Sequence, residues 1–182
     1  EQQLKSGDLV VQGIFERFVA PDQRKKRLGN DINSDAILKL SGNSTSGEKL
    51  FADTQISQCN KCHRVGGSGQ MIGPDLTDIA KKRSPEQLLK SILDPSAEID
   101  PQFTTHAVLT FDGKIVTGLK LEGTADSTVI RSADGKTHTI PNDDIDQVTR
   151  QTSSLMPVGL AAEMTALELA DLLAYLSSLK GG

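Results

Sequence analysis

The sequence predicts an α+β fold, in which a helical core is interrupted by an inserted antiparallel β-meander. Helix start signals occur at residues 84–87 and 165–168, on either side of a stretch of alternating polar and apolar residues at 103–140. The chain has 182 residues, enough for one domain with an elaborate insertion or for one domain plus a short extension, but hardly for two full cores. One core is therefore expected.

Three helices are predicted for the core. A short helix is expected at residues 47–53, behind a polar linker. A second helix has Ser84 as its N-cap, a proline at its first position, and a stop at Asp94, which precedes another proline. The last helix begins with a capping box at 165–168, continues as a stripe of leucines, and is expected to stop at Gly181.

The insertion is predicted to contain four strands, because β-branched residues alternate with polar ones there. The expected strands are residues 104–111, 115–121, 128–131 and 137–140. Asp112-Gly113 and Asp134-Gly135 are expected to form hairpin turns, because such pairs tolerate the positive φ that primed turns need.

The domain boundaries follow from these elements. Residues 1–46 are predicted to be an N-terminal extension or joining segment, and residues 47–182 a domain with its β insertion at about 103–150. Residues 9–19 are interpreted as a helix or as the end of one from a preceding domain. The basic run at 24–27 is interpreted as a solvated surface.

Composition limits the classes of partner. A formal charge of −4 and a pI near 5.4 give no reason to expect binding to nucleic acid or to an anionic membrane. No stretch approaches the roughly 18 apolar residues of a spanning helix, and no signal sequence precedes Glu1, so a soluble mature protein or an excised fragment is expected. Aromatic residues make up only 3% of the chain, and a large flat cofactor could supply the missing apolar bulk.

The run Cys59-Asn60-Lys61-Cys62-His63 is a CxxCH motif. Its two thiols are spaced so that each can add to one haem vinyl group, while the adjacent His63 becomes the proximal iron ligand. A thioredoxin-like redox pair should lie in a βαβ context, which the pattern lacks, and a structural zinc needs four ligands where this cluster offers three. The motif therefore predicts one covalently bound haem.

A proximal imidazole usually donates its second N–H to an acceptor. Pro74 follows the glycine-rich loop at 65–73, and its carbonyl is the predicted acceptor for Nδ1 of His63. The alternative is that Gly73-Pro74 only turns the chain.

The distal iron ligand must come from another segment, and the candidates are Met71, Met156, Met164, His106 and His138. Met71 lies eight residues after His63 in the proximal loop, and Met164 is better explained as a hydrophobic staple on Leu169. The two histidines fall in predicted strands. Met156, in an irregular segment before the last helix, is favoured, with an open site or a histidine ligand as alternatives.

These motifs together resemble class I cytochrome c. The resemblance lies in Gly-x-x-Leu-Phe at 47–51 before the CxxCH motif, Gly-Pro-Asp-Leu at 73–76 after it, and Met156-Pro157 ahead of the leucine-rich helix. A narrower resemblance is to the haem-binding domain at the C-terminus of large exported bacterial dehydrogenase-like proteins. It is carried by the meander and by residues 83–86, 91–96, 154–157 and 170–172, with 14–18 and 26–29 similar to the joining segment.

The resemblance implies a class I cytochrome c core with the meander inserted between the proximal His63 and distal Met156 segments. It implies one haem c held by Cys59 and Cys62, and an electron carrier that is not itself an enzyme, although the chain could be a fragment of a larger oxidoreductase. The implied donor is a fused or partner dehydrogenase, the acceptor is another redox carrier, and the location is periplasmic or otherwise exported. Two alternatives stay open: a haem enzyme or gas or peroxide sensor with a labile distal ligand, and a binding module with a structural haem.

Overall fold

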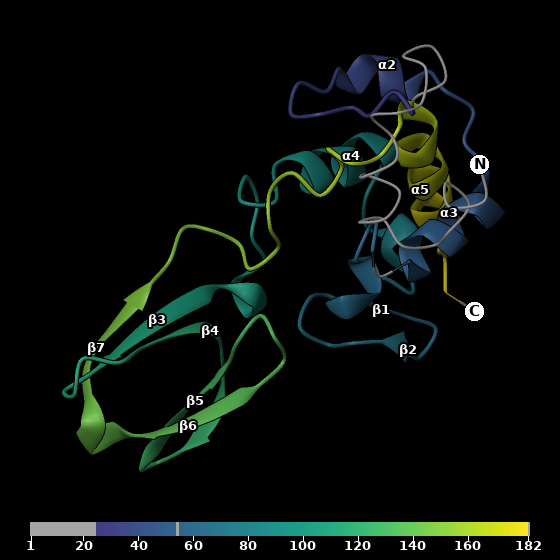
Figure 1. Cartoon of the computed structure of the whole chain (residues 1–182). Coiled ribbons are helices and arrows are strands. Elements are labelled where there is room, and N and C mark those ends of the chain that lie inside the picture. The colour runs from purple at the N-terminus through teal and green to yellow at the C-terminus, as the bar shows by residue number, and fades with distance from the viewer. Residues whose placement is uncertain (1–24, 54, 182) are drawn as a thin grey trace, which may run out of the picture.

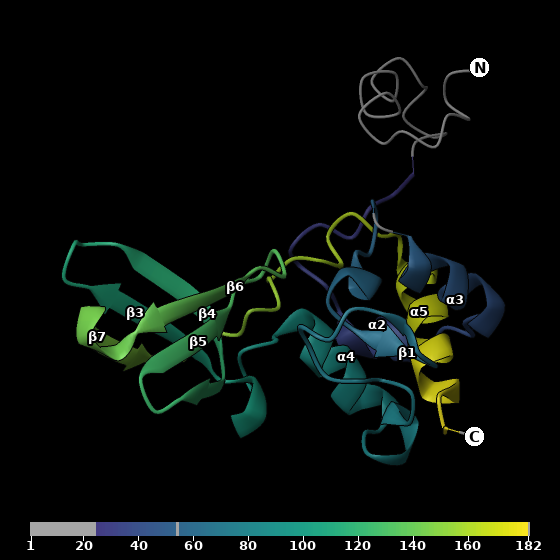
Figure 2. The same cartoon turned by 90° about the horizontal axis from the view of Figure 1, so that it is seen from below.

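The computed structural model describes residues 25–53 and 55–181, in which helices and a small sheet form two adjacent lobes (Figures 1 and 2). Within these residues no helix is long and apolar enough to cross a membrane. The expected helix at 9–19, the joining segment at 14–18 and the first residue of the basic run at 24–27 lie outside the described residues. The helices are α2 (Ser34–Leu38), α3 (Ser44–Ala52), α4 (Pro85–Leu93) and α5 (Ala166–Ser178), with short 3-10 turns between them. Between α3 and α4, the short strands β1 (Arg64–Val65) and β2 (Ser68–Gly69) form a two-stranded antiparallel sheet.

Helix α3 begins earlier than the sequence indicated. The expected start at Gly47 is wrong, because the Asn43 side chain accepts a hydrogen bond from the Ser46 backbone and starts the helix at Ser44. Gly47 is instead an interior residue pressed against α5, where an added Cβ would lie 2.0 Å from the carbonyl oxygen of Asp171. The glycine that resembled a helix start is a close-packing residue.

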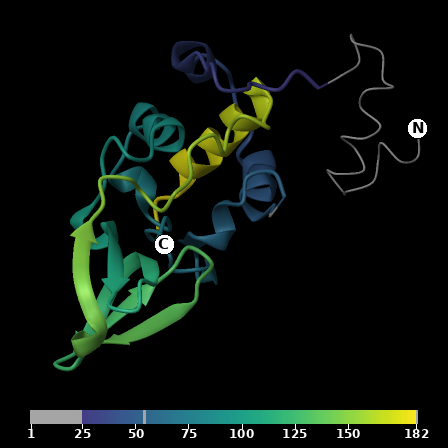
Figure 3. The ribbon, with the colours of Figure 1, turned by 60° about the vertical axis from the view of Figure 1, so that its left-hand side comes forward.

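Helices α4 and α5 begin as predicted. Ser84 with Gln87, and Thr165 with Glu168, form complete capping boxes. Helix α4 ends at Leu93 with Asp94 as its C-cap, whereas α5 ends at Ser178, three residues before the expected stop at Gly181. Figure 3 shows α5 between α4 and α3. Apolar side chains of α5 pack there with those of the other helices in one core cluster. Its buried members include Leu169, Leu172, Leu173, Leu176, Ile37, Phe51, Leu88, Leu89 and Ile92.

The inserted segment forms one antiparallel sheet, called here the sheet lobe. Its strands are β3 (Thr105–Thr110), β4 (Ile115–Thr124), β5 (Ser127–Arg131), β6 (Thr137–Pro141) and β7 (Ile145–Arg150). The four predicted strands are present, and β7 is a fifth strand that the sequence analysis missed. It pairs with β3, so that Val108 lies opposite both Val116 of β4 and Val148 of β7.

The sheet curls strongly on itself. The strand order is β6-β5-β4-β3-β7, so the last two strands of the chain lie at opposite edges. They are nevertheless joined by only the short turn η6 (Asn142–Asp144), which brings the two edges together at one end (Figure 1). Val108, Val116, Ile130 and Ile140 fill the resulting interior as a core separate from that of the helices.

The two Asp-Gly turns differ from the primed type that was expected. In each turn only the glycine has a positive φ, +83° at Gly113 and +81° at Gly135. Asp112 and Asp134 do not, because Gln58 is the single non-glycine residue with positive φ in the described part of the chain. In the first turn, Thr110 donates to the Lys114 carbonyl at 2.9 Å, which leaves a three-residue loop. A type I′ turn needs positive φ at both central residues, so the primed-turn prediction is wrong.

Two contacts connect the sheet lobe with the rest of the molecule. Nη1 of Arg131 donates to the Met71 carbonyl at 3.2 Å, and Ile72 lies beside Gly135. The two chain segments that lead into and out of the lobe are also joined, because the Ser154 backbone donates to the Ser96 hydroxyl at 3.1 Å. The sheet lobe is thereby held at more than its two covalent connections.

Replacing Ile130 by Ala should destabilise the sheet lobe by about 2–5 kcal/mol, because the side chain is fully buried among the strands. Urea unfolding followed by circular dichroism measures the loss. Since the two cores are separate, the helices should keep their own packing, and simultaneous loss of native helical signal at low urea would contradict this.

Candidate haem site

The CxxCH motif is anchored to the end of α3. The fully buried Ser57 hydroxyl donates to the Leu50 carbonyl, and the Asn60 side chain donates to the Ala52 carbonyl at 2.8 Å. Gln58 adopts a left-handed conformation, with φ at +56°, and this turns the chain into the 3-10 helix η3 (Cys59–Lys61). The motif thus follows α3 through a tight, hydrogen-bonded turn.

His63 is held in one orientation. Its Nδ1 lies 2.9 Å from the Pro74 carbonyl oxygen, the contact expected from the sequence, so Nδ1 carries the proton and Nε2 is the nitrogen able to bind a metal. Burial lowers the pKa of His63 below its ordinary value, and the Pro74 carbonyl opposes this shift. The ring is therefore neutral near pH 7, as an iron ligand must be.

Gly73 lets the proximal loop lie directly against the imidazole. A Cβ at this position would lie 2.6 Å from Cε1 of His63, and one at Gly69 would lie 2.2 Å from the His63 carbonyl oxygen. The flat group that this glycine-rich loop passes is thus the ring of His63 itself. No larger side chain fits at Gly73 without moving the ring.

Polar contacts close the proximal loop. Arg64 donates to Oδ2 of Asp75 through Nε at 2.8 Å and is ion-paired with it through Nη2 at 2.7 Å, while Thr77 donates to Oδ1 from both its backbone and its hydroxyl. The hydrogen bonds from Thr77, followed by that from Arg64, lower the pKa of Asp75 to about 2. Asp75 stays ionised at neutral pH and fixes the loop on both sides of Pro74.

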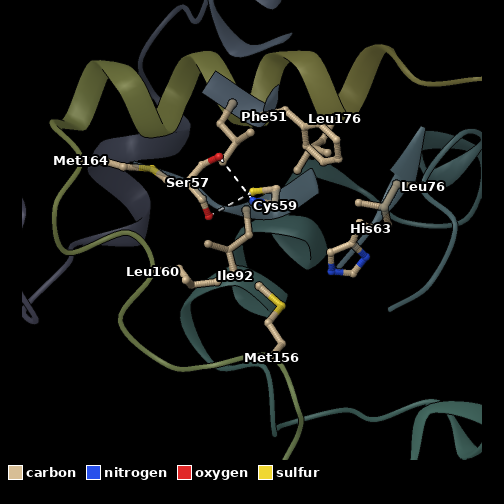
Figure 4. Close-up of a pocket in the computed structure, with 11 residues that line it drawn as sticks. Phe51, Ser57, Cys59, His63, Leu76, Ile92, Met156, Leu160, Met164 and Leu176 are labelled. Atoms are coloured by element: carbon tan, nitrogen blue, oxygen red, sulfur yellow. Dashed lines mark hydrogen bonds between the residues drawn. The ribbon is translucent and has the colours of Figure 1, made fainter. Parts of the chain in front are cut away.

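The predicted ligands Cys59, His63 and Met156 converge on one apolar pocket, which is open to solvent (Figure 4). Cys59, His63 and Met156 line it, together with apolar side chains that include Leu76 and Ile92. Helix α3, the CxxCH turn, α4, α5 and the segment around Met156 all contribute to the lining. Two segments that are far apart in sequence thus meet at the same space: the CxxCH motif brings a thiol and an imidazole, and the segment around Met156 brings a thioether.

Cys62 is placed differently from Cys59. It is half-buried and does not line the pocket, although it follows η3 directly and its backbone carbonyl accepts from Ile72 and Gly73. Burial raises the pKa of both thiols above the ordinary value. The hydrogen bond with Ser57 opposes this rise at Cys59, and the positive charge of Lys61 opposes it at Cys62. Both are neutral thiols near pH 7.

The other candidate distal ligands are less well placed. The Met71 side chain is 53% exposed, and His106 and His138 lie in the sheet lobe, bonded to the Thr104 carbonyl and to the Ser132 hydroxyl. Met164 does line the pocket, but it is 1% exposed and belongs to the same core cluster as Leu169, as a staple residue should.

The residues fit a covalently attached haem. The donor set is a neutral imidazole, a thioether and two neutral thiols, and the space between them is lined almost entirely by hydrocarbon, which suits a flat apolar macrocycle.

Several supporting residues escaped the sequence analysis. Ser57, Gln58 and Asn60 place the motif on α3, and Arg64 closes the proximal loop. Their signal in the sequence is weak, because Ser, Gln and Asn next to a motif are ordinary loop residues. The Arg64–Asp75 pair joins residues eleven positions apart, and no local pattern predicts such a pairing.

Gly73→Ala should push the His63 ring away from the Pro74 carbonyl, because the added methyl group occupies the position of ring atoms. The tautomer and hydrogen bonding of His63, read by ¹⁵N NMR, should change. Gly29→Ala is the matched control, since it meets nothing within 4 Å and adds only backbone strain at φ +65°. An unchanged His63 signal in Gly73→Ala would contradict the packing described here.

Comparison with known proteins agrees with this geometry at the level of family. Residues 44–114 match the family model described as Cytochrome c, which is less than half of the chain. No curated protein matches the chain. Among solved structures, the crystal structure of SoxXA from P. pantotrophus is similar, with 16% identity, a TM-score of 0.41, and coverage of 89% of this chain and 98% of that one. The matched residues, 44–114, include Cys59, Cys62, His63 and Pro74.

Proposed function

We propose that this chain is a monohaem c-type cytochrome that transfers single electrons. The observation that carries the proposal is the convergence of Cys59, His63 and Met156 on one apolar pocket, with Nδ1 of His63 held by the Pro74 carbonyl. A bound haem would supply an iron that alternates between the ferrous and ferric states. The function of the protein is then to hold that iron in constant surroundings.

Each predicted residue has one task in this proposal. Cys59 and Cys62 would hold the haem through two thioether bonds, each made by adding an S–H group across a vinyl group. His63 would bind the iron through Nε2, because the Pro74 carbonyl keeps the proton on Nδ1. Met156 would supply a thioether, a ligand that raises the reduction potential of haem iron.

The surroundings favour fast electron transfer. Leu76, Ile92 and Leu176 line the pocket with hydrocarbon, so the proposed iron would lie among apolar side chains. The proximal loop is closed by the Arg64–Asp75 ion pair and the glycine contact with His63, which hold the imidazole in one orientation. Rigid ligands and an apolar lining keep the structural cost of changing redox state small.

The donor is proposed to be a fused or partner dehydrogenase, the acceptor another redox carrier, and the location the periplasm or another exported compartment. These finer statements are supported by the sequence motifs at 83–86, 91–96 and 154–157, which resemble the haem-binding domain of exported dehydrogenase-like proteins. Covalent haem attachment through CxxCH also suits an exported protein, because the cofactor cannot dissociate after the chain has left the cytoplasm.

Met156→Ala should convert the carrier into a ligand-binding haem protein. The reduction potential should fall, the ferric sulfur-to-iron charge-transfer band should vanish, and the ferrous form should begin to bind CO. Met71→Ala is the matched control, because that side chain is mostly exposed and outside the pocket. Retention of the band in Met156→Ala, with its loss in Met164→Ala, would assign the distal ligand to Met164 instead.

Replacing both Cys59 and Cys62 by Ala should abolish covalent haem and most of the fold. The core is poor in aromatic residues and relies on the porphyrin for buried apolar area. Mass spectrometry of the denatured protein reports attachment, and thermal unfolding reports stability. A well-folded, haem-free double variant would count against this account of the core.

A further inference from the structure

The segment that carries Met156 also carries the sheet lobe. Strand β7 ends at Arg150, and Met156 follows six positions later within an irregular stretch, residues 151–160. A second connection, residues 94–104, runs from α4 to β3. Met156 therefore lies on one of the two linkers between the lobes, and any movement of this linker moves its thioether.

One hydrogen bond ties the Met156 linker to the other linker, and a second holds Met156 to Ser154 within its own linker. The Ser96 hydroxyl accepts from the Ser154 backbone N–H at 3.1 Å, and the Ser154 hydroxyl accepts from the Met156 backbone N–H at 3.1 Å. We call Ser96 and Ser154 the linker clasp. The linker clasp connects the segment after α4 with Met156, whose side chain lines the pocket.

The clasp has a firm base at Ser96. Asp94, the C-cap of α4, accepts from the Ala97 backbone at 3.2 Å, which folds the chain into a turn around Ser96. Two residues further on, the Glu98 carboxylate accepts hydrogen bonds from both terminal nitrogens of Arg83, at 2.7 and 2.8 Å. A bidentate pair of this kind restrains direction as well as distance, so Ser96 is fixed to the helical lobe.

The Met156 linker is also held at its start. The Gln151 backbone donates to the Thr105 carbonyl at 2.8 Å, which extends the β3–β7 ladder by one bond. Between this bond and Ser154 only two residues are left to span from the sheet lobe to the clasp. The stretch from Gln151 to Ser154 is thus short and held at both ends, and Met156 follows two residues after its second anchor.

We propose that Ser96 and Ser154 are positioning residues that keep the Met156 thioether directed into the pocket and opposite His63. This inference rests on the proposed function, in which Met156 is the distal iron ligand. The Met-off conformation would be a minor state, reached when the clasp breaks and the linker moves away with the sheet lobe. The distal coordination site would then be open to an exogenous ligand.

The size of the effect follows from the strength of a hydrogen bond. One such bond of ordinary net strength changes an equilibrium by about two- to tenfold. A ligand that binds only the open state has an apparent affinity proportional to the open fraction. Losing one clasp bond should therefore raise the CO affinity of the ferrous protein by about two- to tenfold, with the His63 side unchanged.

The test uses the haem-loaded full chain and carbon monoxide as the probe. CO titrations compare the unaltered protein with Ser96→Ala, Ser154→Ala and Met156→Ala. Ser96→Thr keeps the accepting hydroxyl and should restore the affinity of the unaltered protein. Ser91→Ala is the matched control, because its exposed hydroxyl donates only to the Gln87 carbonyl within α4. The intensity of the sulfur-to-iron band provides a second readout that needs no added ligand.

Increased CO affinity and a weaker charge-transfer band in both clasp variants, with Ser91→Ala unchanged, would support the proposal. Affinities equal to that of the unaltered protein, in a background where Met156→Ala binds CO well, would overturn the clasp and leave His/Met ligation intact. If the unaltered ferrous protein already bound CO as tightly as Met156→Ala, the proposed distal ligation itself would be wrong.

Discussion

The close approach of α3 to α5 is the contact on which the rest of the helical lobe depends. Gly42 and Gly47 let the backbone around α3 pass so near to α5 that a Cβ at either glycine would lie 2.1 or 2.0 Å from a carbonyl oxygen of that helix. The Asp171 carboxylate receives the Asn43 backbone N–H at 2.6 Å, and the rings of Phe51 and Tyr175 pack 5.6 Å apart. The CxxCH turn is hydrogen-bonded to the end of α3, so the packing of α3 against α5 also determines the position of Cys59.

The His63 side of the pocket is built from short-range contacts, and the Met156 side is not. His63, Gly73 and Pro74 lie close together in one loop that the Arg64–Asp75 pair closes, so the imidazole is oriented by residues close to it in sequence. Met156 follows the sheet lobe in the chain. Its position depends on the contact between the two linkers of that lobe, so it relies on residues far from it in sequence.

The insertion gives the sheet lobe access to both sides of the pocket. Arg131 contacts the proximal loop at the Met71 carbonyl, and the Met156 linker leaves directly from β7. A partner that shifted the sheet lobe would act on both loops together. Without the sheet lobe, the loop after His63 and the segment around Met156 would contact only the helices and would not be linked through a common lobe.

Much of this protein can be predicted from local sequence, because capping, turn formation and the CxxCH spacing are properties of a few adjacent residues. The starts of α4 and α5, four strands and the Pro74 contact with His63 belong to this class. The true start of α3, strand β7 and the three-residue turns do not, since each depends on packing against a distant segment. Only the tertiary structure decided that Met156 meets His63 and Cys59 in one pocket, because that meeting requires the helices, the proximal loop and the linkers of the sheet lobe to be packed together.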